Sequence, residues 1–275
     1  MKVEEGSADL GITGLDRFLE LSAEGSDSML IVEDLGFGHC ELVMGVPDSW
    51  LDVDSMDDLA DLSHDLRERG RDLRIATKYP RLVQHHLFRH GVNYFSLVQS
   101  SGTLEAAPAM GFADIIADIS SSGTTMRENR LKTIEDGIIL VSQACIIGNR
   151  RMLTKEESTR LETKSILEHV EAHLRARDFF SITANIRGNS PEEVAAHVTQ
   201  RPDLSGLKGP TISRVYSDDS DTWYAATMVV PRDKLLGVVD HLRQVGGGSV
   251  TVFQAHYVFQ DQCNSYQELL QALGK

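Results

Sequence analysis

Short apolar runs alternate with amphipathic stretches along the first two-thirds of the chain. The apolar runs predict strands over residues 8–13, 29–35, 40–46, 73–77, 94–98, 115–119 and 137–147. The amphipathic stretches predict helices over residues 56–69, 80–90 and 155–177. Strands that alternate with helices are typical of an α/β architecture.

Local sequence signals fix the ends of two of these helices. Ser55 can cap the first helix, with Asp58 three residues further on and Gly70 at its end. The second helix has Pro80 in its first turn and Gly91 just beyond its last turn. The third, 155–177, is long and rich in Glu, Leu and Arg, and we interpret it as a connector.

The last third of the chain has a different pattern. Strands are predicted over residues 179–187, 211–216, 222–230 and 250–259, with helices over 191–200 and 234–245. The order strand, helix, strand, strand, helix, strand is that of a ferredoxin-like module. We therefore expect a domain boundary near residue 178.

Composition and charge narrow the range of partners. The formal net charge is -14, which disfavours nonspecific binding to nucleic acid or to an anionic membrane. Phosphorylated small molecules remain compatible with this charge, since a few local donors can hold a phosphate. Three scattered cysteines argue against a disulfide framework or a structural zinc site and indicate a cytosol-like compartment.

Candidate chemistry is concentrated in residues 113–129, ADIIADISSSGTTMREN. Asp114 and Asp118 fall on one face of the predicted strand, because side chains repeat every second residue. Gly123 allows a ligand close to the backbone, and Ser121, Ser122, Thr124 and Thr125 add hydroxyl donors before a helix expected to start at Met126. An acid suited to ribose hydroxyls, followed by a phosphate-binding loop, describes a 5-phosphoribosyl site.

Other interpretations of these residues stay open. Loops of Ser, Thr and Gly between a strand and a helix often cap the helix and bind nothing. Arg127, Arg130 and Lys132 follow the loop and can face either a pyrophosphate group or water. His85, His86 and His90 have a spacing that can bind zinc on a helix, but no third ligand is marked, so we expect an exposed helix face and no protein-bound metal.

Several blocks of sequence resemble the ATP phosphoribosyltransferase family, in the right order. They are ADLGITGLD at residues 8–16, EDLGFGHCELVMGVP at 33–47, SGTLEAAPAMGFADIIADISSSGTTMRENRL at 101–131 and VSQACIIGNR at 141–150. LSGLKGPTIS at residues 204–213 is similar to the regulatory domain of the long form, and the details are closest to the plant type.

The resemblance implies a fold and a reaction. The fold would be a two-lobed core like that of periplasmic binding proteins, followed by the ferredoxin-like (ACT-like) domain. Residues 1–45 and 135–178 would form the first catalytic domain, 46–134 the second, and 179–275 the regulatory domain. The enzyme would be a glycosyltransferase that opens histidine biosynthesis, joining ATP to phosphoribosyl pyrophosphate with Mg²⁺ and releasing pyrophosphate.

Residue roles follow from the same resemblance. Residues 121–125 would hold the 5-phosphate. Asp118 and Glu105 would be the catalytic carboxylates: Asp118 would hold the ribose hydroxyls, and Glu105 would line the same pocket. Asp114 and Arg127 are further candidates for substrate binding, and Thr13 and Gly14 for the ATP side. Histidine would inhibit by binding near Pro210, Thr211 and Ser249.

The resemblance also carries expectations for the whole protein. We expect a homo-oligomer, from dimer to hexamer, in the cytoplasm, or in a plastid if the source is a photosynthetic eukaryote. The family has a basic strand–helix segment before the ADLGITG block, and nothing here matches it, so we expect this chain alone to form phosphoribosyl-ATP poorly or not at all. The alternative is a noncatalytic regulatory protein that binds phosphoribosyl groups or histidine.

Overall fold

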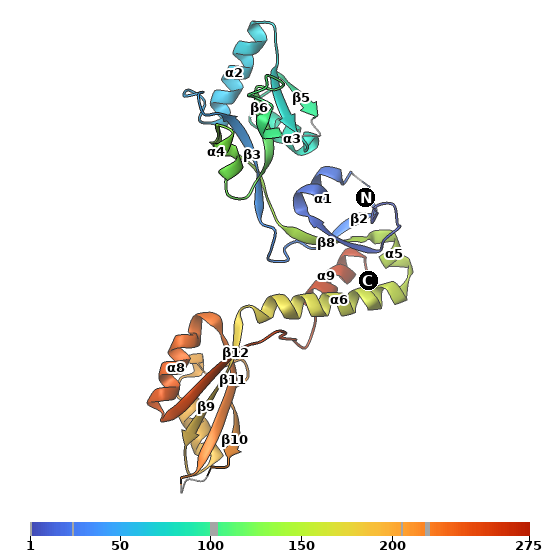
Figure 1. Cartoon of the computed structure of the whole chain (residues 1–275). Helices are drawn as coiled ribbons and strands as arrows, with labels where there is room; N and C mark the ends of the chain where they lie inside the picture. Colours follow the sequence, from blue (N-terminus) through green and yellow to red (C-terminus); the bar gives the residue numbers. More distant parts are fainter. Residues whose placement is uncertain (1, 24, 100–103, 205, 218–220) are drawn as a thin grey trace. The chain divides into compact units, whose positions relative to one another are not determined.

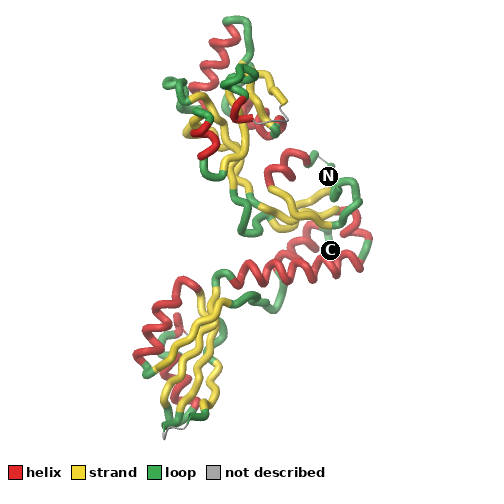
Figure 2. Tube along the Cα trace, viewed as in Figure 1, coloured by secondary structure: helices red, strands yellow, loops and turns green. Residues whose placement is uncertain are grey.

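The computed structural model describes residues 2–23, 25–99, 104–204, 206–217 and 221–275. Contacts divide the chain into two units, Met1–Arg160 and Leu161–Lys275. Each unit contains its own sheets and helices, as the colouring by secondary structure shows (Figure 2).

The larger sheet of the first unit has five strands in the order β5-β4-β6-β3-β7. Their bounds are β3 Cys40–Pro47, β4 Leu73–Thr77, β5 Phe95–Gln99, β6 Ile115–Ser120 and β7 Leu131–Ser142. Strands β4, β5 and β6 are parallel, whereas β3 runs antiparallel to both β6 and β7. The carboxyl ends of the three parallel strands therefore lie along one edge of the sheet.

Each face of this sheet is covered by apolar packing. Leu42, Met44, Ile75 and Ile115 pack on one face with residues of α2 (Met56–Glu68) and α3 (Pro80–Arg89). On the other face, Val43 and Ile116 pack with Leu104 of the short turn η1 (Leu104–Ala106) and Met126 of α4 (Thr124–Glu128). Asp118 shares this second face with Ile116, since the two positions are two residues apart in β6.

The smaller sheet has the order β1-β8-β2 and is antiparallel throughout. Its strands are β1 Leu10–Gly14, β2 Ser28–Val32 and β8 Ala144–Asn149. Helix α1 (Leu15–Leu21) follows β1 directly, and its Leu15 and Phe18 form a core with Cys145, Ile147 and Val3.

The prediction of one strand over residues 137–147 is wrong. The chain forms β7 and β8 there, which belong to two different sheets and are separated at Gln143 (Figure 1). The apolar run continues through the crossing, although Ile138 and Val141 of β7 are exposed (46% and 58%) and the residues of β8 are buried. A hydrophobic pattern therefore does not show where the chain passes from one sheet to another.

The second unit contains a four-stranded antiparallel sheet in the order β10-β11-β9-β12. Its elements are β9 Phe179–Arg187, α7 Pro191–Val198, β10 Thr211–Val215, β11 Trp223–Pro231, α8 Leu235–Gln244 and β12 Gly247–Gln254. Alternate residues of β9 and β11 are buried with residues of α7 and α8. This order and connectivity confirm the predicted ferredoxin-like module.

Helix α6 (Glu157–Ala176) precedes the module, and α9 (Asn264–Ala272) follows it. The sequence pattern predicts α6 but misses α1, α5 (Arg150–Lys155) and α9, which have six to nine residues each. The expected cap of α2 is present: the Asp58 N–H donates to Ser55 Oγ (3.2 Å), and the Ser55 N–H donates to Asp58 Oδ2 (2.9 Å). Across the described residues, no helix is both long and apolar enough to cross a membrane.

Candidate functional site

Two chain segments that carry polar side chains leave the same edge of the five-stranded sheet. Lys78 directly follows β4, and the loop of Ser121, Ser122 and Gly123 directly follows β6, the parallel neighbour of β4. In α/β sheets, ligands bind outside the carboxyl ends of the strands. A ligand site is therefore expected at this edge of the sheet.

The loop after β6 is shaped by Gly123 and by Ser120. Gly123 is the residue before α4 and has a φ of 68°, a left-handed conformation that side chains disfavour. Its N–H donates to Ser120 Oγ (3.0 Å), which closes the turn. Helix α4 starts at Thr124, two residues earlier than expected, so Thr124 and Thr125 present first-turn N–H groups as well as hydroxyls.

Arg127 folds back over this loop. Its Nη2 donates to the Ser122 carbonyl (3.2 Å) and to Thr124 Oγ1 (3.4 Å), which also accepts a bond from Ser122 Oγ (3.0 Å). A Cβ atom added to Gly123 would lie 3.0 Å from Arg127 Nη1. The guanidinium group therefore lies beside the hydroxyls that the sequence marks for phosphate binding. Lys132, by contrast, is paired with Asp54 Oδ1 (2.6 Å).

A hollow of about 380 Å³ lies next to the loop. Its lining comes from the loop and from strands β3 and β7, namely Glu41, Val43, Ser120, Ser121, Ser122, Gly123, Thr133, Ile134, Glu135 and Ile138. Its volume is in the range of small-molecule sites. A ligand held by the loop would therefore have room beside the sheet.

Asp118 lies in β6 between β3 and the end of β4. It pairs across the sheet with Val43, one of the residues that line the hollow. Burial raises the pKa of Asp118, and the charge of Glu105 raises it further, whereas the Ile119 N–H and the charge of Lys78 lower it. The two predicted catalytic carboxylates thus lie within electrostatic reach of each other, with Lys78 as the nearby cation.

Asp114 lies at the opposite end of the same strand. Its carboxylate accepts hydrogen bonds from Arg71 Nη1 (2.8 Å), Arg74 Nη2 (3.0 Å) and the Arg74 N–H (2.9 Å). Four residues of extended chain, roughly 13 Å, separate it from Asp118. The structure brings Asp114 to arginines and not to the loop.

Thr13 and Gly14, the residues predicted for the ATP side, lie at the end of β1. Gly14 precedes α1, and a Cβ atom added there would lie 2.3 Å from Asp16 Oδ1. Asp16 is buried, with 4% of its surface exposed, and accepts hydrogen bonds from Tyr79 Oη (2.7 Å) and Ser142 Oγ (2.8 Å). Any side chain at position 14 would therefore collide with the Asp16 carboxylate. Thr13, the residue before Gly14, is half-buried.

Tyr79 connects this buried acid to the edge of the larger sheet. Burial, the hydrogen bond to Asp16 and the charges of Asp16 and Asp118 all raise its pKa, so its hydroxyl stays a neutral donor. Its backbone follows Lys78, and its N–H donates to Thr77 Oγ1 (3.0 Å). Sequence reasoning missed Asp16, Lys78, Tyr79 and Ser142; the signal available was the position of the first three just after strands and of Ser142 at the end of one.

The histidines of α3 form no metal site in the described structure. The rings of His86 and His90 lie 4.5 Å apart, but no group of three metal-ligating side chains occurs among the described residues. Burial and the nearby charges of His90 and Arg89 lower the pKa of His86 to about 4, so it is neutral at physiological pH.

The predicted regulatory residues lie apart within one copy of the chain. Pro210 and Thr211 lie at the start of β10, whereas Ser249 lies in β12, at the opposite edge of the sheet. Three strand spacings, roughly 14 Å, separate these edges. A pocket that uses both positions would need two copies of the module. Ser249 itself lies at an irregularity of β12 and has a φ of 52°.

Comparisons with known proteins match both units of the chain. A family model described as "HisG: ATP phosphoribosyltransferase" matches residues 1–172, and "HisG, C-terminal domain" matches residues 176–257. ATP phosphoribosyltransferase 2, chloroplastic, of Arabidopsis thaliana is 40% identical over 279 residues, which cover 99% of this chain and 67% of the relative. The ATP phosphoribosyltransferase of Brucella anthropi is 48% identical over 161 residues, 58% of this chain and 70% of that protein.

A solved structure, the ATP phosphoribosyl transferase (HisG:HisZ) complex from Thermotoga maritima, matches 62% of this chain and 71% of its own, at 25% identity and a TM-score of 0.48. The two family models and the plant relative carry the assignment, because together they span nearly the whole sequence. The chain belongs to the ATP phosphoribosyltransferase family.

Proposed function

We propose how this ATP phosphoribosyltransferase, which carries out the first step of histidine biosynthesis, binds its phosphoribosyl substrate. Residues 121–125 hold the 5-phosphate of phosphoribosyl pyrophosphate, and Asp118 accepts hydrogen bonds from the ribose hydroxyls. The observation that carries the proposal is the position of Asp118 and the loop at one sheet edge, beside a hollow of about 380 Å³.

The chemistry needs positioning and charge more than a protein nucleophile. Adenine N1 of ATP forms a bond to the anomeric carbon while the bond from that carbon to the pyrophosphate oxygen breaks. Positive charge develops on the ribose ring, where the carboxylates of Asp118 and Glu105 stabilise it. Lys78 supplies positive charge near the departing pyrophosphate, Arg127 supplies it beside the loop that holds the 5-phosphate, and Thr13 and Gly14 are proposed for the ATP side.

Mg²⁺ fits this site as an ion carried mainly by the substrate. Asp118 and Glu105 offer hard carboxylate oxygens, and magnesium commonly uses one or two carboxylates together with substrate phosphates. When bound, it neutralises charge on the leaving pyrophosphate. Neither carboxylate alone would hold the ion.

Substitution of Gly123 tests the phosphoribosyl site. In Gly123→Val, a branched side chain occupies the path to the loop backbone, and we expect calorimetric titration to detect no binding of phosphoribosyl pyrophosphate. Gly70→Val is the matched control, since Gly70 also has a positive φ (83°) but has open space around its added Cβ. Unchanged affinity in folded Gly123→Val protein would refute the assignment of the loop.

We also propose that the ferredoxin-like module binds histidine and inhibits the enzyme. A cavity of about 550 Å³ supports this, because Leu207 and Lys208, just before the predicted Pro210 and Thr211, line it together with Arg175 and Asp261. Its cationic and acidic side chains suit the carboxylate and ammonium groups of an amino acid. Ser249 lies on the other edge of the sheet, so it would contribute from a second copy of the module.

A further inference from the structure

The segment that follows β12 runs back along helix α6. The Val258 N–H donates to the Ala172 carbonyl (3.0 Å), and Arg175 Nη1 donates to the Val258 carbonyl (3.1 Å). Between these two residues of α6, His173 Nδ1 lies 3.2 Å from the His256 carbonyl oxygen. Residues 258–275 lie beyond the part of the chain that the family models match, 1–172 and 176–257. Neither family model therefore describes this segment.

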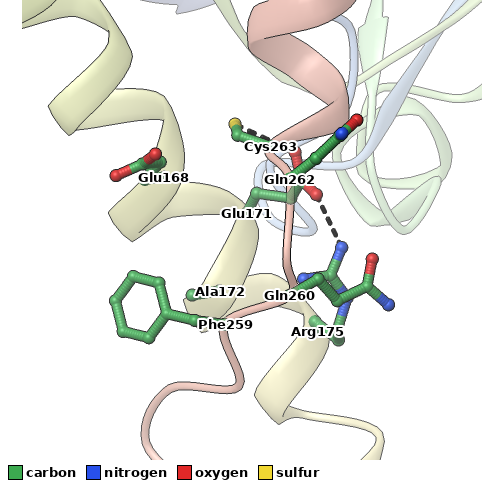
Figure 3. Close-up of a pocket in the computed structure, with 8 residues that line it drawn as sticks. All are labelled: Glu168, Glu171, Ala172, Arg175, Phe259, Gln260, Gln262 and Cys263. Atoms are coloured by element: carbon green, nitrogen blue, oxygen red, sulfur yellow. Dashed lines mark hydrogen bonds and ion pairs between the residues drawn. The ribbon is translucent and has the colours of Figure 1, made fainter.

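Glu171 is the centre of this attachment (Figure 3). Its Oε2 accepts hydrogen bonds from Cys263 Sγ (3.3 Å) and from the Ser265 N–H (2.9 Å), in the first turn of α9. Its Oε1 lies 2.6 Å from Arg175 Nη2. One carboxylate on α6 thus binds the segment before α9, the start of α9 and the arginine that holds Val258.

The apolar part of the attachment is weaker. The rings of Tyr257 and Phe259 stack on each other and contact His169, but 52% and 56% of their surfaces are exposed. Leu269 is the buried residue of α9. Because exposed rings contribute little burial energy, we infer that the polar contacts at Glu171 dominate the attachment.

The same segment forms one wall of the cavity of about 550 Å³. Val258, Phe259, Gln260, Asp261, Gln262 and Asn264 line this cavity from one side. Leu207 and Lys208, from the loop that leads to β10, line it with Arg175 of α6. A ligand in the cavity would therefore touch the segment, the module and α6 at once.

We propose that residues 258–275 are a strap that couples ligand binding in the ferredoxin-like module to helix α6, through Glu171. Ligand in the cavity strengthens or weakens the hold of the strap on α6, which continues into the catalytic unit. This inference rests on the proposed regulation by histidine. It adds the physical link by which binding in the module reaches the rest of the chain.

Glu171→Gln tests the hold of the strap in the full chain. The amide loses the ionic bond to Arg175 and weakens the bonds to Cys263 and Ser265. We expect chymotrypsin to cut the native protein at Tyr257, Phe259 or Tyr266 about tenfold faster than it cuts the unsubstituted protein. Glu168→Gln is the matched control: Glu168 lies one turn earlier on α6, lines the smaller cavity beside Glu171, and pairs with Lys164 (3.6 Å).

A histidine titration of the same proteins tests the coupling. Without histidine, turnover is expected to be equal in all three, because Glu171 lies outside the proposed catalytic site. In Glu171→Gln we expect the histidine concentration for half-inhibition to shift several-fold, with no shift in Glu168→Gln. Histidine should also change the cleavage rate of the unsubstituted protein.

The outcomes separate the strap from the regulation on which it rests. Equal cleavage and equal inhibition in Glu171→Gln and Glu168→Gln would refute the strap while leaving histidine regulation intact. A protein that does not bind histidine at all would overturn the proposed regulation and with it the coupling. Faster cleavage of Glu171→Gln without any change in inhibition would show a structural attachment only, and would also refute the coupling.

Discussion

Asp118 lies in β6 and Asp114 directly precedes that strand, yet the two carboxylates have opposite effects on stability. Burial raises the pKa of Asp118, so its ionised form destabilises the fold at neutral pH. Burial would also raise the pKa of Asp114, but hydrogen bonds from Arg74 and Arg71 lower it overall. Ionised Asp118 thus destabilises the folded protein but can accept hydrogen bonds from a substrate, whereas ionised Asp114 stabilises the fold.

This contrast gives a prediction for two conservative substitutions. Asp118→Asn should raise the melting temperature at pH 7, by a few degrees for each ~1 kcal/mol gained, and should weaken binding of phosphoribosyl pyrophosphate. Asp114→Asn should lower the melting temperature. The Asp118 difference should fade as the pH falls towards about 4, the unfolded value, whereas the Asp114 difference should persist to about 4 and fade only below it. Calorimetric melts between pH 3 and 8 would measure this, and equal signs for the two variants would contradict it.

Gly14 is explained by its neighbour Asp16. An added Cβ atom would lie 2.3 Å from Asp16 Oδ1, inside van der Waals contact, although the φ of Gly14 (-73°) suits any residue. Gly14→Ala should therefore lower the free energy of unfolding by about 1–3 kcal/mol, as overpacking usually does. In an Asp16→Ser background the penalty of the alanine should shrink. Equal penalties in both backgrounds, in chemical denaturation, would exclude the proposed clash.

Among the elements, α4 is followed, two residues beyond its end, by a residue with a strained backbone. Arg130 follows the helix with a φ of 56°, a position at which glycine is favoured. Arg130→Gly should raise the free energy of unfolding by about 1 kcal/mol. Glu128→Gly, two residues earlier and inside the helix, should lower it by a similar amount. If Arg130→Gly destabilises the protein, the strain is absent or Arg130 makes a compensating contact.

The attachment of α9 to α6 depends on pH. Burial would raise the pKa of Glu171, but bonds from the Ser265 N–H, Arg175 and Cys263 lower it to about 2. A lowered pKa means that the stabilisation is present above the unfolded value, near 4.5, and is lost as the pH falls towards 2. Glu171→Gln should therefore be less stable than the parent by about 1–3 kcal/mol at pH 7, with the difference vanishing near pH 2. A pH-independent difference would show that packing dominates.

The sequence predicts elements well where local signals mark their ends. The strand over 73–77 and the capped helix from residue 56 match the structure because Ser55, Asp58 and Gly70 act locally. The site is only partly predictable. Asp118 and its loop are contiguous, whereas Tyr79 and Ser142 reach Asp16 across 63 and 126 residues. The hydrogen bonds of Tyr79 and Ser142 to Asp16 form only in the folded chain, so no local sequence pattern predicts them.

For the whole molecule, the division into two units predicts that substrate binding and the response to histidine can be separated. The first unit contains the proposed phosphoribosyl site, and the second contains the ferredoxin-like module. Truncation after Arg177 should abolish the response to histidine and leave binding of phosphoribosyl pyrophosphate within about threefold of the full chain, a change of under ~1 kcal/mol. Parallel calorimetric titrations with each ligand would test this. Loss of substrate binding in a truncated protein with native circular dichroism would contradict it.

The central claim concerns where the phosphoribosyl group binds, and a crystal structure with phosphoribosyl pyrophosphate and Mg²⁺ measures this directly. We predict 5-phosphate oxygens at hydrogen-bond distance, about 2.7–3.2 Å, from N–H and hydroxyl groups of residues 121–125. The ribose hydroxyls should contact Asp118. A phosphoribosyl group bound elsewhere, with the loop after β6 making no contact to it, would contradict the account.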